Sequence, residues 1–167
     1  MELGLFQNQP GDKHKFDGIT AAYQRHKKDP DPESTHGELI FRDGVMYSSS
    51  GRGGLFAGHG LWPGVGTRFI HLRDIEPHKW KRYPLLISRK KEDQIREDCE
   101  SQKPLAYDWL GILGQPLPGN IQWPWAVYCT ETCNDKICHR IKTILYKPKM
   151  RPGEILDWYR AEGLIGG

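Results

Sequence analysis

Short apolar runs separated by turn residues predict antiparallel β-structure in the first half of the chain. Four such runs predict strands, at residues 38–41, 45–48, 67–72 and 83–87. Asp43-Gly44 lies between the first two runs. An Asp-Gly step in this position is a strong signal for a β-hairpin, because glycine accepts the backbone angles of a tight turn. His36 stands just before the first run, so we expect it to enter the hairpin.

Helical patterns are concentrated in the rest of the chain. Helices are expected at residues 19–28, 89 to about 102, 107–113, 129 to about 145 and 153–161. Ser88 can cap the second of these, and Ile95 and Cys99, four residues apart, mark its buried face. Gly163 should end the last helix. Residues 1–11, with their glycines and proline, predict only a loose lead-in.

The overall composition indicates one globular domain spanning residues 1–167. Hydrophobic residues make up 37% of the 167 residues and charged residues 27%, which is a balance that can bury a core. The net charge is only +3, from 24 basic and 21 acidic residues. Such a small excess gives no electrostatic case for nucleic acid as a partner, so we expect none.

No segment has the sequence of a leader or a membrane anchor. The first eleven residues lack the basic start and apolar core of a secretory signal, and no run approaches the ~20 apolar residues of a membrane span. We therefore expect no signal peptide and no stable membrane insertion. The four cysteines are expected to be free thiols in a reducing compartment.

Residues 49–66 are rich in glycine and have little periodicity. They predict a long exposed loop, and such a loop in a compact domain is often functional. A lid or a wall facing the substrate is one interpretation. Plain flexibility is the other, and the sequence leaves both open.

Cys129 is the candidate nucleophile. It follows an apolar stretch and opens a predicted helix whose first turn, Thr130-Glu131-Thr132, is polar. A helix N-terminus lowers the pKa of a thiol, because its backbone N–H groups and positive dipole end favour the thiolate. Those N–H groups could also form part of an oxyanion hole. Alternatively, the cysteine is a small buried hydrophobe, as most buried cysteines are.

His36 and Glu38 are the candidate partners of this cysteine. They are two residues apart on a strand and should project from the same face. His36 would act as general base and acid, and Glu38 would hold the imidazole in the correct tautomer. Taken alone, the pair is better interpreted as the exposed polar face of an edge strand. The presence of Cys129 favours the catalytic interpretation.

The order of these motifs resembles a known family. A histidine in STHGELIF, an Asp-Gly hairpin, YDWLGIL and a cysteine in WAVYCTE follow one another over residues 17–140. This order resembles the circularly permuted NlpC-type papain-like cysteine hydrolases, which include YiiX-like proteins and lecithin:retinol acyltransferase-like enzymes. The resemblance implies an α+β, permuted papain-like fold, in which a small antiparallel β-sheet carries the histidine and packs against helices.

The resemblance also implies chemistry and substrate. Cys129 would be the nucleophile and His36 the base, and the third polar residue of many members lies on the next strand, where this chain has Ser48 and no acid. Glu38 is our first choice for that role and Ser48 the second. The expected activity is a hydrolase of amide bonds, first of all in the peptides of bacterial peptidoglycan, with a lipid or thioester acyl bond as the runner-up. We expect no cofactor, and a bacterial or bacteriophage protein that is cytoplasmic in the producing cell or virion-associated.

Two rival interpretations come from other classes of protein. The first is a zinc site, with its candidate ligands on one predicted helix: Cys129, Cys133, Cys138 and His139. Their spacing is poor for a zinc knuckle, so we expect no metal. The second is a binding module without catalysis, in which Trp62, Trp80 and Trp123 would be contact residues. These tryptophans could also be half-buried edges of the core.

Overall fold

The structure, a computed structural model, describes residues 1–9, 15–50, 66–103, 105–107, 126–127, 129–141 and 150–166. Five strands form an antiparallel sheet in the order β4-β3-β2-β1-β5. Their bounds are β1 Glu2–Gln7, β2 Ser34–Ile40, β3 Val45–Ser50, β4 Gly66–His71 and β5 Trp80–Pro84. A separate parallel pair joins β6 Ala106–Tyr107 to β7 Ala126–Val127.

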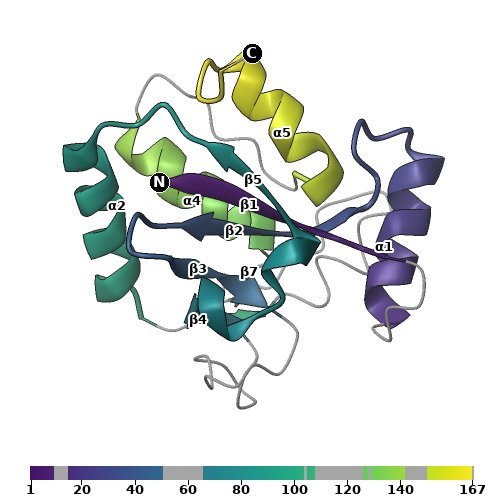
Figure 1. Ribbon diagram of the computed structural model, residues 1–167, viewed down its shortest axis with the longest axis horizontal. Helices are drawn as coiled ribbons and strands as arrows, with labels where there is room; N and C mark the ends of the chain where they lie inside the picture. The colour runs from purple at the N-terminus through teal and green to yellow at the C-terminus, as the bar shows by residue number, and fades with distance from the viewer. Residues whose placement is uncertain are drawn as a thin grey trace.

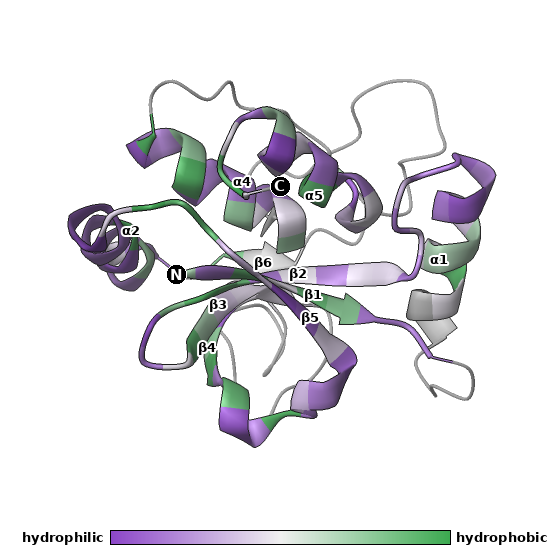
Figure 2. Cartoon of the chain, turned by 45° about the horizontal axis from the view of Figure 1, so that its top comes forward, coloured by the Kyte–Doolittle hydropathy of each residue, from purple (hydrophilic) through white to green (hydrophobic). Residues whose placement is uncertain are grey.

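Helices surround this sheet. Their bounds are α1 Lys15–His26, α2 Arg89–Ser101, α4 Cys129–Arg140 and α5 Pro152–Ala161, with short 3-10 turns η1 Leu72–Asp74 and η2 Pro77–Lys79. Helices α4 and α5 pack on one face of the sheet, and α1 and α2 lie at its opposite ends (Figures 1 and 2). The expected α+β class, with an antiparallel sheet packed against helices, is confirmed.

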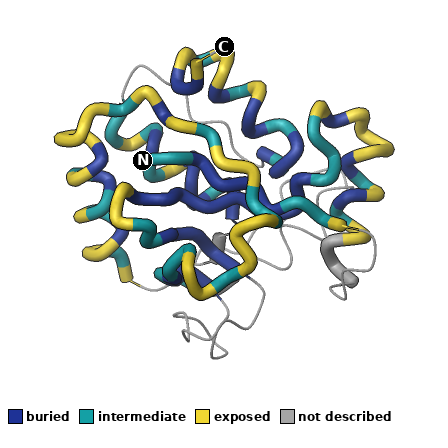
Figure 3. The backbone as a smooth tube through the Cα atoms, viewed as in Figure 1, coloured by how far each residue is buried: buried dark blue, intermediate teal, exposed yellow. Residues whose placement is uncertain are grey.

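The sheet is buried on both faces at its centre. Side chains that point toward the helices form the main core, among them Leu3, Leu5 and Leu39. The opposite face carries a second cluster around Ile40, Met46 and Ile70. Because alternate side chains of a strand point to opposite faces, β2 contributes to both layers and is buried along its whole length (Figure 3).

The first residues of the chain are a strand, so the expectation of a loose lead-in is wrong. Strand β1 lies between β2 and β5 and pairs with both. Leu3 and Leu5 are the alternate apolar positions expected of a strand, but Gly4 between them weakens the strand pattern in the sequence. A Cβ at Gly4 would lie 2.7 Å from the Cδ1 of Ile40 and 3.2 Å from the ring of Trp80. The glycine therefore permits close packing within the strand and does not break it.

The predicted hairpin is confirmed. The N–H of Phe41 donates to the carbonyl of Val45 at 2.8 Å, and the N–H of Gly44 donates to the carbonyl of Phe41 at 2.8 Å. Gly44 has a φ of 80°, which explains why glycine is needed at this turn. Helix α2 is also confirmed, with Ser88 as its N-cap and Cys99 buried in the core.

Several other boundaries differ from those expected. The strand expected at 83–87 is Trp80–Pro84, because the chain then leaves the sheet: the N–H of Leu86 donates to the carbonyl of Leu164, which follows α5. Helix α4 ends at Arg140 and not near residue 145; residues 142–149 lie outside the described residues. The helix expected at 107–113 begins in a strand, and residues 108–113 also lie outside. So does most of the expected loop, residues 51–65.

Candidate active site

The first turn of α4 packs against β2 at Gly37. The pairing between β2 and β3 covers only Leu39 with Tyr47 and Ile40 with Met46. At Gly37 the Ser48 hydroxyl donates to the Gly37 carbonyl at 2.8 Å, and the Cys133 thiol donates to the same oxygen at 3.5 Å. Side chains thus take the place of the strand ladder, and this opening lets α4 approach the backbone of β2.

The absence of a side chain at Gly37 allows this close approach. A Cβ at Gly37 would lie 3.2 Å from the Cγ2 of Thr130, which is tighter than most real contacts. Thr130 is itself held in place, because its hydroxyl donates to the carbonyl of Met150. The start of α4 is therefore fixed against β2 on one side and against Met150, two residues before α5, on the other.

His36 and Glu38 lie together on β2, as their spacing predicts. The Nε2 of His36 is 2.9 Å from the Oε1 of Glu38. The two residues are 5% and 0% exposed, and β2 lies inside the sheet, so the alternative of an exposed edge strand is wrong. Because Nε2 faces the carboxylate, Nδ1 is the nitrogen left to face Cys129. The imidazole therefore has the orientation that a general base needs.

Ser48, the second choice for the third residue, contacts the backbone. Its hydroxyl donates to the carbonyls of Gly37, at 2.8 Å, and Ser49, at 3.3 Å. Of the two candidates, the structure brings Glu38 to the imidazole. The role of Ser48 is to hold the opening between β2 and β3.

Arg68 completes a buried row of polar groups. Its Nη2 lies 2.9 Å from the Oε1 of Glu38, the same oxygen that faces His36. Arg68 comes from β4 and is 7% exposed. Since β3 lies between β4 and β2, the long side chain has to cross β3, and its partner in the register there is the small Ser48. Sequence patterns do not identify this residue, because its only signal is a charge within an apolar run.

Cys129 is the first residue of α4 and is 2% exposed. Burial alone would raise the pKa of its thiol. The charge of His36, a hydrogen bond with its side chain, and hydrogen bonds from the backbone at Gly37 and Thr130 outweigh burial, so the pKa lies below the ordinary value of 9.0. The backbone of Thr130, at the start of α4, is the type of donor that the sequence predicted, whereas the donor at Gly37 comes from β2.

The pKa of His36 shifts in the opposite direction. Burial disfavours its charged form, but the neighbouring Cys129 and Glu38 more than compensate and raise the pKa from 6.5 to about 9. A lowered thiol pKa and a raised imidazole pKa describe the same event, which is transfer of the thiol proton to the ring. Both shifts favour the thiolate and imidazolium form of the pair, which is the reactive form of a cysteine nucleophile.

The other three cysteines have the opposite environment. Burial raises the pKa of Cys99 to about 12 and that of Cys138 to about 11, and raises the pKa of Cys133 well above 9.0. All four thiols are free. The environment therefore singles out Cys129 as the thiol that ionises most easily.

The proposed zinc ligands do not converge. Cys133 faces the carbonyl of Gly37, and the Cys138 thiol donates to the Oδ1 of Asn134 at 3.2 Å. Across the part of the chain that the structure describes, no three His, Cys, Asp or Glu side chains are placed to hold a metal ion. The geometry thus gives the zinc interpretation no support.

Trp80 forms a wall beside the histidine. It lies in β5 and is half-buried, with its ring centroid 6.0 Å from that of His36 in an edge-on arrangement. Phe6, which pairs with both residues in the strand register, also contacts the indole, with its ring centroid at 5.5 Å. This tryptophan is therefore a half-buried edge of the core; Trp62 and Trp123 lie outside the described residues.

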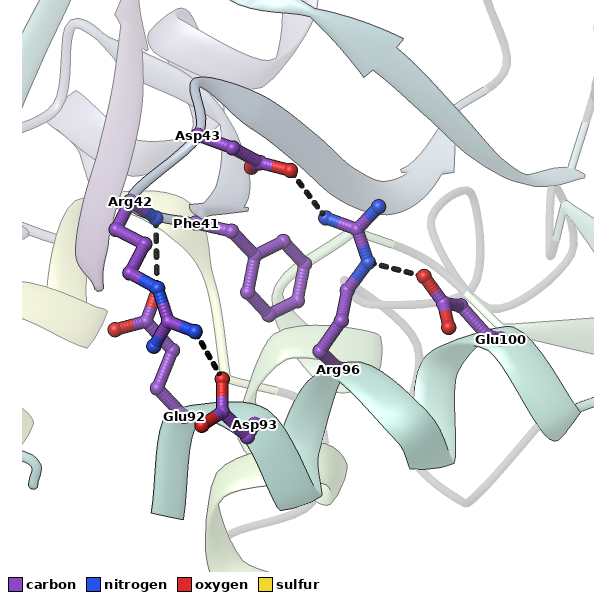
Figure 4. A pocket seen from close by; sticks show the side chains of 7 residues that line it. All are labelled: Phe41, Arg42, Asp43, Glu92, Asp93, Arg96 and Glu100. Carbon is purple, nitrogen blue, oxygen red and sulfur yellow. Dashed lines mark hydrogen bonds and ion pairs between the residues drawn. The ribbon is translucent and has the colours of Figure 1, made fainter. Parts of the chain in front are cut away.

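A surface pocket of about 320 Å³ lies elsewhere, between the β2–β3 turn and α2 (Figure 4). Its lining residues are Phe41, Arg42, Asp43, Glu92, Asp93, Arg96 and Glu100. Both arginines are paired with carboxylates, Arg42 with Asp93 and Arg96 with Asp43 and Glu100. The pocket contains none of the residues of the cysteine site, so it does not mark the candidate chemistry.

Comparisons with protein-family models, with curated proteins and with solved structures give no match for this chain. Over the described ranges, no helix has the length and apolar character needed to cross a membrane.

Proposed function

We propose that this protein is a cysteine hydrolase that cleaves an amide bond by acyl transfer. The observation that carries the proposal is the buried row formed by Cys129, His36 and Glu38, in which charge and hydrogen bonding outweigh burial and favour a thiolate and an imidazolium. Such a pair is costly to build and is typical of an activated nucleophile. A purely structural cysteine would gain nothing from a lowered pKa.

The geometry supports the following reaction. The Cys129 thiolate attacks the substrate carbonyl, and backbone N–H groups at the start of α4 would stabilise the resulting oxyanion. The amide C–N bond then breaks as the His36 imidazolium gives its proton to the leaving amine, leaving an acyl thioester on Cys129. Water attacks this thioester while neutral His36 takes the water proton. Release of the acid restores the thiolate and the imidazolium.

The substrate we propose is a peptide of bacterial peptidoglycan. This choice rests on the resemblance of the motif order to permuted NlpC-type hydrolases, and an enzyme of this kind would act in the producing cell or with the virion. A lipid or thioester acyl bond is the alternative within the same chemistry. All of these substrates pass through the same Cys129 thioester, so one experiment can compare them.

The test is to incubate the full chain with purified peptidoglycan, a p-nitrophenyl acyl ester and a panel of lipids, followed by mass spectrometry of both the small products and the protein. We expect a released peptidoglycan fragment and a transient acyl adduct on Cys129. The Cys129→Ala variant should give neither. A product that forms equally with this variant, or no Cys129-dependent product from any substrate, would contradict the hydrolase and favour a binding module.

The pH profile of hydrolysis should be bell-shaped. Turnover needs a protonated His36, whose pKa is about 9, so kcat/KM should fall about tenfold per pH unit above that value. It also needs an ionised Cys129, so the rate should fall again in acid, at a lower pH than for an ordinary thiol because the pKa of this thiol is lowered. Steady-state rates at constant ionic strength would measure both limbs. A rate that keeps rising well above pH 9 would show that no imidazolium is required.

A further inference from the structure

Arg68 and Glu38 form an ion pair that is almost entirely shielded from water. Their side chains are 8% and 0% exposed, and the Nη2 to Oε1 distance is 2.9 Å. An ion pair in such a place is a weak source of stability, because removing two charges from water costs about as much as their attraction returns. A stability role alone gives little reason for an arginine to extend across β3 to this carboxylate.

The charges in this region alternate along one row. The thiolate of Cys129 is followed by the imidazolium of His36, the carboxylate of Glu38 and the guanidinium of Arg68, so the buried row is neutral as a whole. Cys133 is the other titratable group close to Glu38 and Cys129 within the described residues, and burial keeps its thiol neutral. The row therefore balances only if Arg68 is present.

Glu38 needs this balance more than the other members do. Burial would by itself raise the pKa of the carboxyl, and the Arg68 charge is the largest of the effects that lower it again. A protonated Glu38 would no longer attract the imidazolium. The Arg68 guanidinium thus acts on the carboxylate that holds the histidine and does not itself contact the reacting atoms.

We propose that Arg68 is a positioning residue of this active site, which acts through Glu38 to hold His36 as the charged partner of the Cys129 thiolate. The inference rests on the proposed function for its catalytic meaning, although the charge coupling can be measured without a substrate. Arg68 touches neither the thiol nor a reacting atom. Its effect is on the pH range in which the site is active.

Removing the guanidinium charge leaves the row with one net negative charge. A buried row of that charge takes up a proton more readily, so every protonation step within it moves to higher pH. At low pH the thiolate is then lost earlier. At high pH the row is fully deprotonated in either case, so the reactivity of Cys129 should recover.

The test compares alkylation of Cys129 by iodoacetamide across the pH range, followed by mass spectrometry of the modified peptide. In Arg68→Met the acid midpoint of the rate should rise by about one pH unit or more, which is about a tenfold slower reaction on the acid limb. Arg68→Lys keeps the charge and should restore most of the wild-type profile. A rate reduced by one constant factor at every pH would overturn the proposal, because lost packing alone scales the rate without moving the midpoint.

The route through Glu38 is tested in a Glu38→Gln background. There the Arg68→Met change should shift the midpoint by less than half as much, since the carboxylate that couples the two is gone. An equal shift in both backgrounds would overturn the proposal. Arg68→Met alone leaves a buried carboxylate without its partner, which can destabilise the fold. The double variant Glu38→Gln/Arg68→Met removes both charges and is expected to fold. If the single variant does not fold, the comparison of Glu38→Gln with the double variant decides: no shift supports the route, and a shift of about one pH unit overturns it.

The two proposals fail in different ways. A midpoint that moves as expected, in a protein without Cys129-dependent turnover, would support the charge coupling and contradict the hydrolase. Cys129-dependent turnover with a midpoint that does not move in Arg68→Met would support the hydrolase and contradict the role of Arg68.

Discussion

Replacing His36 with alanine should raise the pKa of the Cys129 thiol. Burial raises the pKa of this thiol, and His36 is the largest influence that lowers it. Without the imidazolium, the thiol should ionise no more easily than an ordinary cysteine, of which less than about 1% is thiolate at pH 6. We expect the midpoint of thiolate formation to rise by about one pH unit or more, measured by ultraviolet absorbance across pH after subtraction of the Cys129→Ala signal.

His139→Ala is the matched control for this experiment. His139 lies on α4 with Cys129, but it is exposed and ten residues along the helix. Its replacement should leave the titration unchanged. If His36→Ala keeps a low thiol pKa, the helix start alone activates the thiol and His36 is not its proton partner. If both variants raise the midpoint, the change reports a general disturbance of the fold.

Local signals in the sequence predict the hairpin and α2 well. The Asp43-Gly44 turn needs only its own residues and two apolar neighbours, and Ser88 caps the helix that follows it. Strand β1 could not be found in the same way. Its glycine lowers the local strand signal, and what requires Gly4 is the packing of Ile40 and Trp80, which come from distant parts of the chain.

The residues of the candidate site also differ in how far local sequence predicts them. His36 and Glu38 are two residues apart, so a strand places them on one face without further information. Cys129 could be proposed from its place at the start of a helix. Its contact with His36 depends on how the first turn of α4 packs against β2, where the pairing of β2 with β3 is open. Arg68 is beyond local reasoning, because its pairing with Glu38 requires the order β4-β3-β2 and a small residue in the middle strand.

The opening at Gly37 links the fold to the chemistry. In a fully paired sheet the N–H and carbonyl of Gly37 would bond to the next strand. Here the carbonyl accepts from Ser48 and Cys133, and the backbone of Gly37 hydrogen-bonds to Cys129. The unpaired stretch of β2 thereby becomes part of the thiolate's environment, and the small residues around it permit the approach. A local break in strand pairing supplies a donor where a regular sheet would have none.

Replacing Cys129 with serine should abolish turnover while preserving the fold. The hydroxyl is close to the thiol in size but ionises far less easily, so His36 cannot hold it as an anion in the ground state. We expect kcat/KM on the substrate identified above to fall by at least about 10⁴-fold, toward the roughly 10⁶-fold loss found when a nucleophile that works as a unit with its base is removed. Cys138→Ser is the matched control, because it makes the same change on the same helix, and a hydroxyl can keep the hydrogen bond to Asn134. That variant should retain activity within about twofold, since surface-near changes of this kind have small effects. Equal losses in the two variants would point to the stability of α4, whereas retained activity in Cys129→Ser would show that the chemistry does not pass through this thiol.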